Sequence, residues 1–355
     1  MIRCLKSLAK NGFIFTIIGL IILTFCATTS FSFQVITGAG ATFPYPIYAR
    51  WAHDYAQETG ILINYQSIGS GGGIRQIRAS AVDFGASDAP LTAKQLEMWN
   101  LVQFPMIMGG IVPVVKIPGV SINQLKLTGQ LLADIFLGKI KMWDDPKIKA
   151  INPNIKLPHI AITVVHRSDG SGTTWIFTHY LCAVSKEWKE KVGAAKAVQW
   201  PCGLGGKGNE GVSAYVSRIN GAIGYVEYAY ALQNHLCSVL LKNKDGNFVK
   251  ATIKTFEEAA KGADWEHTPA MAVILVNQPG KESWPITGAS FILVHKQYQN
   301  AAKIKAILKF FDWCYRHGAK AAVELDYVPI PMKVVKIVEK LWAKEIKANG
   351  KPVWP

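Results

Sequence analysis

From Val35 onward, short apolar runs alternate with longer amphipathic segments. The run VITGAGATF (35–43) predicts a strand that ends in a glycine turn, and residues 45–60 have the apolar spacing of a helix that stops at Gly60. The next strand, helix and strand are expected in ILINYQSIG (61–69), SGGGIRQIRAS (70–80) and AVDFGASDAP (81–90). Strand, glycine loop and helix in this order are typical of a parallel α/β sheet.

The second part of the chain repeats this rhythm after an apolar, glycine-interrupted segment, FPMIMGGIVPVVKIPG (104–119), which we interpret as a strand pair or a crossover. GAIGYVEYAYA (221–231) and SFILVHK (290–296) predict further strands. Residues 300–347 are expected to be mostly helical, with one helix ending at Gly318. Because no internal repeat or low-complexity linker occurs, we predict two domains joined by short crossovers.

Length and composition support a globular protein with a large core. The chain has 355 residues, of which 50% are hydrophobic and 18% are charged. This length exceeds what one hydrophobic core usually serves, which favours two domains.

The first thirty residues have the pattern of a secretory signal peptide. Arg3, Lys6 and Lys10 precede an uncharged apolar run from Phe13 to Ala27, and small residues follow. We expect cleavage near residue 30 and an exported, soluble product; a retained membrane anchor is the alternative. A lipid anchor at Cys26 is disfavoured, because Phe25 occupies a position where that signal requires a small residue.

Removing residues 1–30 takes away three basic residues and no acidic ones, so the net charge falls from +15 to +12. A basic protein can bind nucleic acid, an anionic surface or an anionic ligand, and export makes nucleic acid the least favoured partner. The cysteines of the mature chain can form up to two disulfides, in three pairings that the sequence does not rank: Cys182, Cys202, Cys237 and Cys314. Neither CxxC nor HExxH spacing occurs, so no metal site and no cofactor are expected.

Three times, small and hydroxyl residues stand immediately before a predicted helix: GAGATF (38–43), GSGGG (69–73) and DGSGT (169–173). Each junction offers unpaired backbone N–H groups and the positive end of a helix dipole. One such junction is an ordinary helix cap. Three in one chain, one of them beside Arg167, favour an anion held by several helix N-termini.

Asp88, in the SDAP loop, is a carboxylate close to this predicted anion site. A carboxylate repels an anion unless the anion has a proton to donate, which selects protonated phosphate over fully ionised sulfate. A turn-forming or capping role is the alternative for Asp88.

Six segments, in this order, closely resemble the periplasmic phosphate-binding proteins of bacterial phosphate ABC transporters. The similarity extends from about Ile36 to Trp342, and the segments are TGAGATFPYPIYARWAHDY, IGSGGGIRQI, VDFGASDAPL, RSDGSGTTWIFTHYL, GLGGKGNEGV and GAIGYVEYAYA. The resemblance implies a type II periplasmic-binding-protein fold: two α/β lobes, each a mixed, mainly parallel sheet flanked by helices, with the ligand in the cleft between them. The expected first lobe combines residues 31–108 and 288–355, and the second comprises residues 109–287.

The resemblance also implies a site, a function and partners. The chain is expected to be a monomeric receptor that binds inorganic phosphate without altering it, and delivers it to a membrane permease and its ATPase. Asp88 corresponds to the residue that accepts the phosphate proton, and Asp169 to the residue that orients the arginine. The other implied phosphate ligands are Thr42, Phe43, Ser70, Arg167, Ser171, Gly172 and Thr173. The chain departs from the family at Gly71, where a second serine is usual, and at His166, where a second arginine is common.

Two other classes of function can be tested separately, and one motif that suggests a nucleotide site is set aside. An exported phosphatase would require a nucleophile with its base or a metal cluster, and turnover of a chromogenic phosphate ester would reveal it. A polyanion-binding adhesin would show steeply salt-dependent binding to heparin or DNA. GKGNEG (206–211) fits GxGxxG, but the required strand and distant acidic residue are not recognisable, so we do not interpret it as a dinucleotide site.

Overall fold

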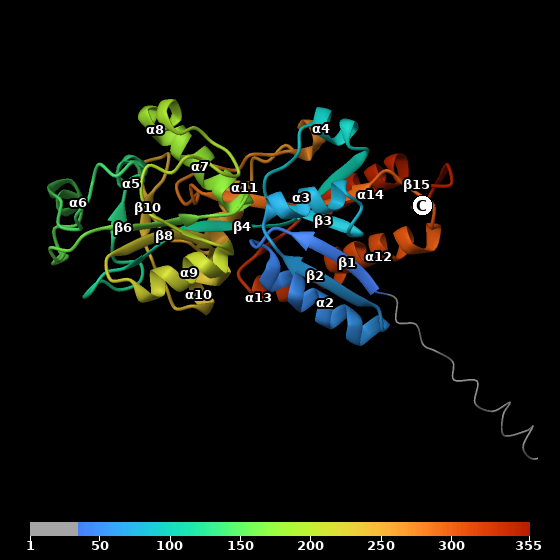
Figure 1. Cartoon of the computed structure of the whole chain (residues 1–355), viewed down its shortest axis with the longest axis horizontal. Helices are drawn as coiled ribbons and strands as arrows, with labels where there is room; N and C mark the ends of the chain where they lie inside the picture. The colour runs from blue at the N-terminus through green and yellow to red at the C-terminus, as the bar shows by residue number, and fades with distance from the viewer. Residues whose placement is uncertain (1–34) are drawn as a thin grey trace, which may run out of the picture. The chain divides into compact units, whose positions relative to one another are not determined.

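The computed structural model describes residues 35–355. The predicted signal peptide and Cys26 lie outside the described residues. Within residues 35–355, a ten-stranded mixed sheet has the order β2-β1-β3-β12-β4-β8-β6-β7, and β14 and β9 also pair with β4. Helices flank this sheet (Figure 1), so the prediction of an α/β protein is confirmed.

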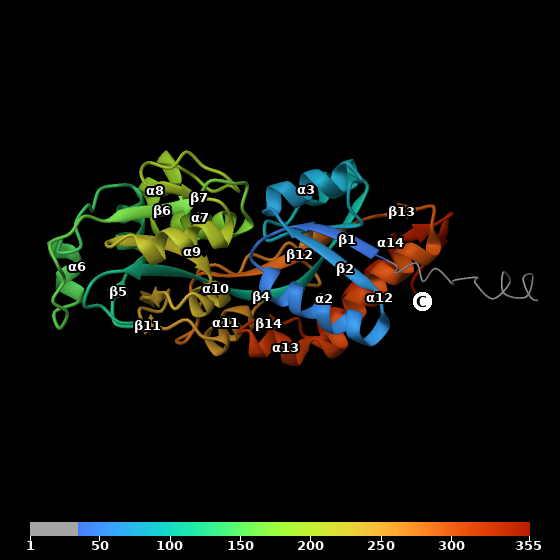
Figure 2. The same ribbon diagram turned by 60° about the horizontal axis from the view of Figure 1, so that its bottom comes forward.

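The first strands and helices match the expected pattern closely. Parallel strands β1 (Val35–Gly40), β2 (Leu62–Ser67) and β3 (Phe84–Ser87) alternate with α2 (Tyr45–Thr59) and α3 (Ser70–Arg78). Helix α2 ends at Gly60, whose φ of 73° gives the left-handed cap that glycine adopts without steric cost. Figures 1 and 2 show α3 on one face of these strands and α2 on the other.

Strand β4 (Leu101–Lys116) links the two parts of the sheet, and it corrects our interpretation of residues 104–119 as a strand pair or crossover. Its residues 101–110 pair with β12 (Thr287–His295), and its residues 111–116 pair with β8 (Ala222–Glu227). A shift of register in the β12 pairing lies opposite Pro105, which lets one strand continue past a residue that lacks a donor. The exchange of partners follows Gly109 and Gly110, close to the predicted lobe boundary.

The middle of the chain forms the part of the sheet around β8. Parallel pairing joins β6 (Thr163–Arg167) to β7 (Leu204–Gly206) and β8. The strand predicted at 221–231 is wrong in its second half, where α10 begins. The other elements of this part are β5 (Lys126–Leu127), α5 (Gly129–Phe136), α6 (Pro146–Ile151), α7 (Gly172–Val184), α8 (Lys186–Lys191), α9 (Gly208–Arg218), α10 (Tyr228–Gln233), β9 (Cys237–Ser238), β10 (Leu240–Lys242), β11 (Phe248–Val249) and α11 (Ile253–Ala260). Helix α4 (Ala93–Met98) precedes β4, the 3-10 helix η1 (Pro269–Met271) precedes β12, and both contact β4.

The C-terminal segment returns to the first part of the sheet, where β12 lies between β3 and β4. Helices α12 (Ala301–His317) and α13 (Ala319–Glu324) contact α2, and α12 ends before Gly318 as expected. The lobe boundaries stay predictions, although this return is the connectivity that a discontinuous first lobe requires. The remaining elements are β13 (Gln297–Tyr298), β14 (Val328–Pro329), α14 (Met332–Glu345), β15 (Lys347–Ala348) and β16 (Lys351–Pro352).

Buried tryptophans tie distant segments together. The indole N–H of Trp51 donates to the carbonyl of Gly318, and that of Trp284 donates to the carbonyl of Ile111, both at 2.9 Å. These bonds satisfy polar groups that would otherwise be costly in an apolar core. Among the described residues, none of the helices has the length and apolar character that a membrane crossing requires.

Candidate anion-binding site

The structure brings all the predicted ligand residues into the interior, at the ends of strands and the starts of helices. We call one group the aspartate wall and the other the arginine wall. The aspartate wall comes from the loop after β1, the start of α3 and the end of β3; the arginine wall comes from the end of β6 and the start of α7. Their members are Thr42, Phe43, Ser70 and Asp88 for the first, and Arg167, Ser171, Gly172 and Thr173 for the second, and all of these residues are buried.

The guanidinium of Arg167 is held rigidly by Asp169. Its Nε donates to Oδ1 of Asp169 at 2.7 Å and its Nη2 donates to Oδ2 at 2.6 Å. Burial would raise the pKa of Asp169, but the bonds from Arg167 keep that pKa below its ordinary value. The third guanidinium nitrogen, Nη1, is buried and has no hydrogen-bond partner within residues 35–355. Arg167 therefore presents a fixed positive donor that its own surroundings do not use.

Asp88 offers the complementary group. Its Oδ1 is buried and unpartnered within residues 35–355, and the side chain is 1% exposed. Burial raises the pKa of Asp88 to about 7, although the nearby hydroxyl of Ser290 and the charge of Arg167 act to lower it. This carboxyl group can therefore exchange a proton close to neutral pH, which is the property needed to share a proton with a weakly acidic oxyanion.

The two walls are in direct contact. Oγ of Ser70 accepts hydrogen bonds from the backbone N–H of Asp88 at 3.1 Å and from that of Gly172 at 3.0 Å. The N–H of Gly71 donates to the carbonyl of Gly170 at 2.7 Å. The N–H of Gly172, which we expected to be a ligand donor, is thus already used by Ser70 in this structure.

Gly172 is required by this close approach. A Cβ at this position would lie 2.5 Å from both Cβ of Asp88 and Oγ of Ser70, a separation that real Cβ atoms essentially never show. Gly172 begins α7, and Ser171 caps that helix by accepting the N–H of Thr174 at 3.0 Å. The DGSGT junction therefore serves both as a helix start and as a contact between the walls.

The loop GKGNEG, which we set aside as a false dinucleotide motif, also lies at this site. It follows β7 and begins α9, where the N–H of Gly208 donates to Oδ1 of Asp169 at 3.1 Å. Asn209 is fully buried, and its N–H donates to Oγ1 of Thr42 at 3.2 Å. The sequence did offer a signal here, a fourth run of small residues before a helix. The contacts of this loop, however, are with residues that lie 39 and 167 positions away along the chain, so the sequence pattern could not reveal them.

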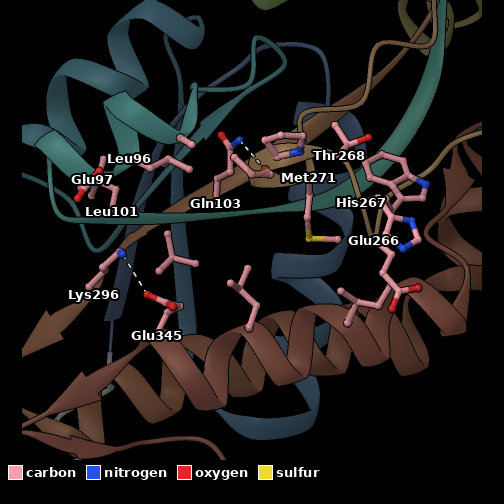
Figure 3. A pocket seen from close by; sticks show the side chains of 17 residues that line it. Leu96, Glu97, Leu101, Gln103, Glu266, His267, Thr268, Met271, Lys296 and Glu345 are labelled. Carbon is pink, nitrogen blue, oxygen red and sulfur yellow. Dashed lines mark hydrogen bonds and ion pairs between the residues drawn. The ribbon is translucent and has the colours of Figure 1, made fainter.

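A cavity of about 540 Å³ lies elsewhere, between α4, η1 and α14 (Figure 3). Two of its polar side chains and its one lysine have partners: Gln103 donates to the carbonyl of Ala270 at 2.8 Å, and Lys296 pairs with Glu345 at 3.0 Å. The lysine of this cavity is already paired, and the carboxylates of Glu97 and Glu266 also line it, so it is not suited to an anion. The unpartnered atoms of Arg167 and Asp88 are the stronger mark of a site.

The described residues give two further results on predicted chemistry. Within residues 35–355, no group of three or more His, Cys, Asp or Glu side chains is arranged to hold a metal ion. The four cysteines of residues 35–355 are all unpaired, so none of the possible disulfides is formed among them in the structure. Burial raises the pKa of the Cys314 thiol well above its ordinary value.

Comparison with known proteins places the chain in a family. The PBP superfamily domain matches residues 27–316. A phosphate-binding protein PstS from Pasteurella multocida is 55% identical over 339 residues, covering 95% of this chain and 98% of that protein. A PstS protein from Methanocaldococcus jannaschii is 40% identical over 330 residues, covering 85% of this chain and 84% of that protein.

A structural comparison agrees with the sequence comparisons. A human phosphate-binding apolipoprotein superposes with a TM-score of 0.71 at 19% identity, covering 89% of this chain and 99% of that chain. This likeness confirms the predicted two-lobed binding-protein fold. The family consists of binding proteins, so the prediction that the chain is not an enzyme is also confirmed. The chain belongs to the PstS family of phosphate-binding proteins, within the PBP superfamily.

Proposed function

We propose that the chain binds one inorganic phosphate between the aspartate and arginine walls, in the periplasm, and delivers it to an ABC-type permease and its ATPase. The observation that carries the proposal is the pairing of two unpartnered buried atoms, Nη1 of Arg167 and Oδ1 of Asp88. The first can only donate a hydrogen bond, and the second is an acceptor when ionised. A ligand that satisfies both must accept at one atom and carry a proton at another.

Protonated phosphate meets this requirement and sulfate does not. Monobasic and dibasic phosphate each retain a proton that Asp88 accepts, whereas sulfate at neutral pH has only acceptors and leaves the Asp88 carboxylate facing an oxygen. The phosphate-binding names of relatives that are 55% and 40% identical support the same ligand. Asp169 supports the role of Arg167 by fixing two of its three nitrogens.

The remaining predicted ligands supply neutral donors. The hydroxyl groups of Thr42, Ser70, Ser171 and Thr173, and backbone N–H groups such as that of Phe43, would surround the phosphate oxygens. A buried anion without such partners would cost several kcal/mol. In our proposal the two lobes close on phosphate, the monomeric closed form is recognised by the permease, and the signal peptide of residues 1–30 directs export.

Calorimetric titration of the phosphate-stripped mature protein with inorganic phosphate tests this function. We expect saturable binding with one phosphate per chain, and no turnover of a chromogenic phosphate ester. No heat of binding, or binding of DNA or heparin that weakens steeply with salt, would contradict the proposal and favour a polyanion-binding role.

A further inference from the structure

Asn209 lies behind the proposed phosphate site and uses all of its N–H groups on the aspartate and arginine walls. Its side-chain Nδ2 donates to Oγ1 of Thr42 at 2.7 Å and lies 3.3 Å from Oγ1 of Thr173. Its backbone N–H donates to the same Thr42 oxygen at 3.2 Å. One residue outside the predicted ligand set therefore connects a hydroxyl from each wall.

The orientation of the Asn209 amide is fixed by the backbone. The N–H of Glu227 donates to Oδ1 of Asn209 at 3.0 Å. A backbone N–H can only donate, so the atom facing it must be the amide oxygen, and the NH₂ group must face the two threonines. Asn209 is fully buried at the second residue of α9, so water does not compete for these bonds.

This arrangement determines what the Thr42 hydroxyl can do. A hydroxyl oxygen has two lone pairs and one proton. Both lone pairs of the Thr42 oxygen are directed to N–H groups of Asn209, and its proton has no acceptor among residues 35–355. Thr42 can therefore act toward a ligand only as a donor. Thr173 accepts a single hydrogen bond from Asn209, which occupies one of the two lone pairs of its hydroxyl oxygen and holds that oxygen beside Thr42.

We propose that Asn209 is a positioning residue that fixes the hydroxyl of Thr42 as a hydrogen-bond donor to the bound oxyanion, holds the hydroxyl of Thr173 in place, and joins the two walls when the site is closed. The inference rests on the proposed function and extends it, because Asn209 itself need not touch the ligand. It assigns donor polarity to the neutral part of the site, as Asp88 assigns acceptor polarity to the charged part.

A double-mutant cycle tests this role by calorimetric titration with inorganic phosphate. Thr42→Val removes the hydroxyl while keeping the shape and the backbone N–H, and Asn209→Ala removes the group that orients it. Each single change should weaken phosphate binding roughly 10- to 100-fold, the range for a hydrogen bond to a charged group. In the Thr42→Val background, Asn209→Ala should weaken phosphate binding by a clearly smaller factor than it does in the wild type, because only the Thr173 hydroxyl is left for Asn209 to hold.

Asn209→Asp provides a second, nearly isosteric variant. Its carboxylate can still accept the N–H of Glu227, but its other oxygen attracts the Thr42 proton away from the ligand. We expect a larger loss than for Asn209→Ala. The additional loss of phosphate affinity in Asn209→Asp, compared with Asn209→Ala, should become smaller when Thr42 is also changed to Val. If the additional loss came only from repulsion between the new carboxylate and the anion, it would be the same in both backgrounds.

Asn243→Ala is the matched control for loss of a buried asparagine. Asn243 is 6% exposed and binds the carbonyls of Gly280, Lys281 and Ser283, away from the site. The Asn243→Ala variant should have a lower melting temperature than the wild type and the same phosphate affinity. Wild-type affinity in Asn209→Ala, or fully additive losses in the cycle, would overturn the positioning role while leaving phosphate binding itself intact. A wild-type protein that binds no phosphate would overturn both proposals.

Discussion

The aspartate wall and the arginine wall are built from the same local pattern, a strand followed by small residues and a helix, yet they offer a ligand opposite chemistry. The aspartate wall carries a carboxyl group whose pKa burial raises to about 7. The arginine wall carries a guanidinium that Asp169 holds in place. Helix starts alone attract any anion. In our proposal, this difference between the walls makes the site selective for an anion that also carries a proton.

Of the changes considered, removal of the charged donor of the arginine wall should lower phosphate affinity the most. Arg167→Ala leaves the aspartate wall facing the ligand with no compensating charge, so we expect phosphate affinity to fall by roughly 10²- to 10³-fold. Titration calorimetry measures the loss. Arg218→Ala removes an exposed charge at the last turn of α9 and is the control, with an affinity close to wild type. Equal, small losses in both variants would mean that Arg167 is only structural.

The buried carboxyl group of Asp88 should make the unfolding free energy of the phosphate-free protein depend on pH. The pKa of Asp88 rises from 3.8 to about 7 in the folded protein, so the folded state holds this proton more tightly than the unfolded state. The stability this proton contributes is present below pH 3.8 and is lost as pH rises to about 7. Asp88→Asn should therefore be more stable than wild type at pH 8, by up to roughly 4 kcal/mol.

Denaturant unfolding of the phosphate-free proteins at pH 4 and pH 8 measures this effect. The difference between Asp88→Asn and wild type should shrink strongly at pH 4, where both side chains are neutral. A difference that does not change with pH would show that Asp88 is not buried in its charged form.

The contact between the walls can be disturbed with a single methyl group. Gly172→Ala places a Cβ 2.5 Å from Asp88 and Ser70, so the walls must separate. We expect phosphate affinity to fall by about tenfold or more, while α7 itself gains helix propensity. Gly262→Ala, where a Cβ meets no atom within 4 Å, is the matched control. Unchanged phosphate affinity in Gly172→Ala would show that binding does not need this close approach of the two walls.

The elements predicted from local patterns were the ones whose signals are local. Helix α2 followed from its apolar spacing and from Gly60, and both ends agree with the structure. Strand β4 was wrongly divided, because Pro105, Gly109 and Gly110 look like interruptions. In the structure, a register shift accommodates Pro105, and pairing with strands far along the chain keeps the segment extended.

In the candidate site, too, the features with a local sequence signal were predicted and those that depend on distant contacts were not. The glycine and hydroxyl junctions, Arg167 and Asp88 stood out by residue type, and family resemblance supplied their pairing. Asn209 was missed, because its importance lies in bonds to Thr42 and Thr173 at sequence separations of 167 and 36 residues. Spacing along the chain carries no information about such contacts. The raised pKa of Asp88 likewise depends on burial by segments that meet only in the fold.

Selectivity between phosphate and sulfate is the most direct test of the difference between the walls. Calorimetric titrations of wild type and Asp88→Asn at pH 8, with each anion separately, would measure it. We predict that wild type binds phosphate and gives no detectable binding of sulfate, and that Asp88→Asn binds phosphate more weakly while gaining affinity for sulfate. A wild-type protein that binds both anions equally, or an Asp88→Asn variant with unchanged preference, would contradict the account.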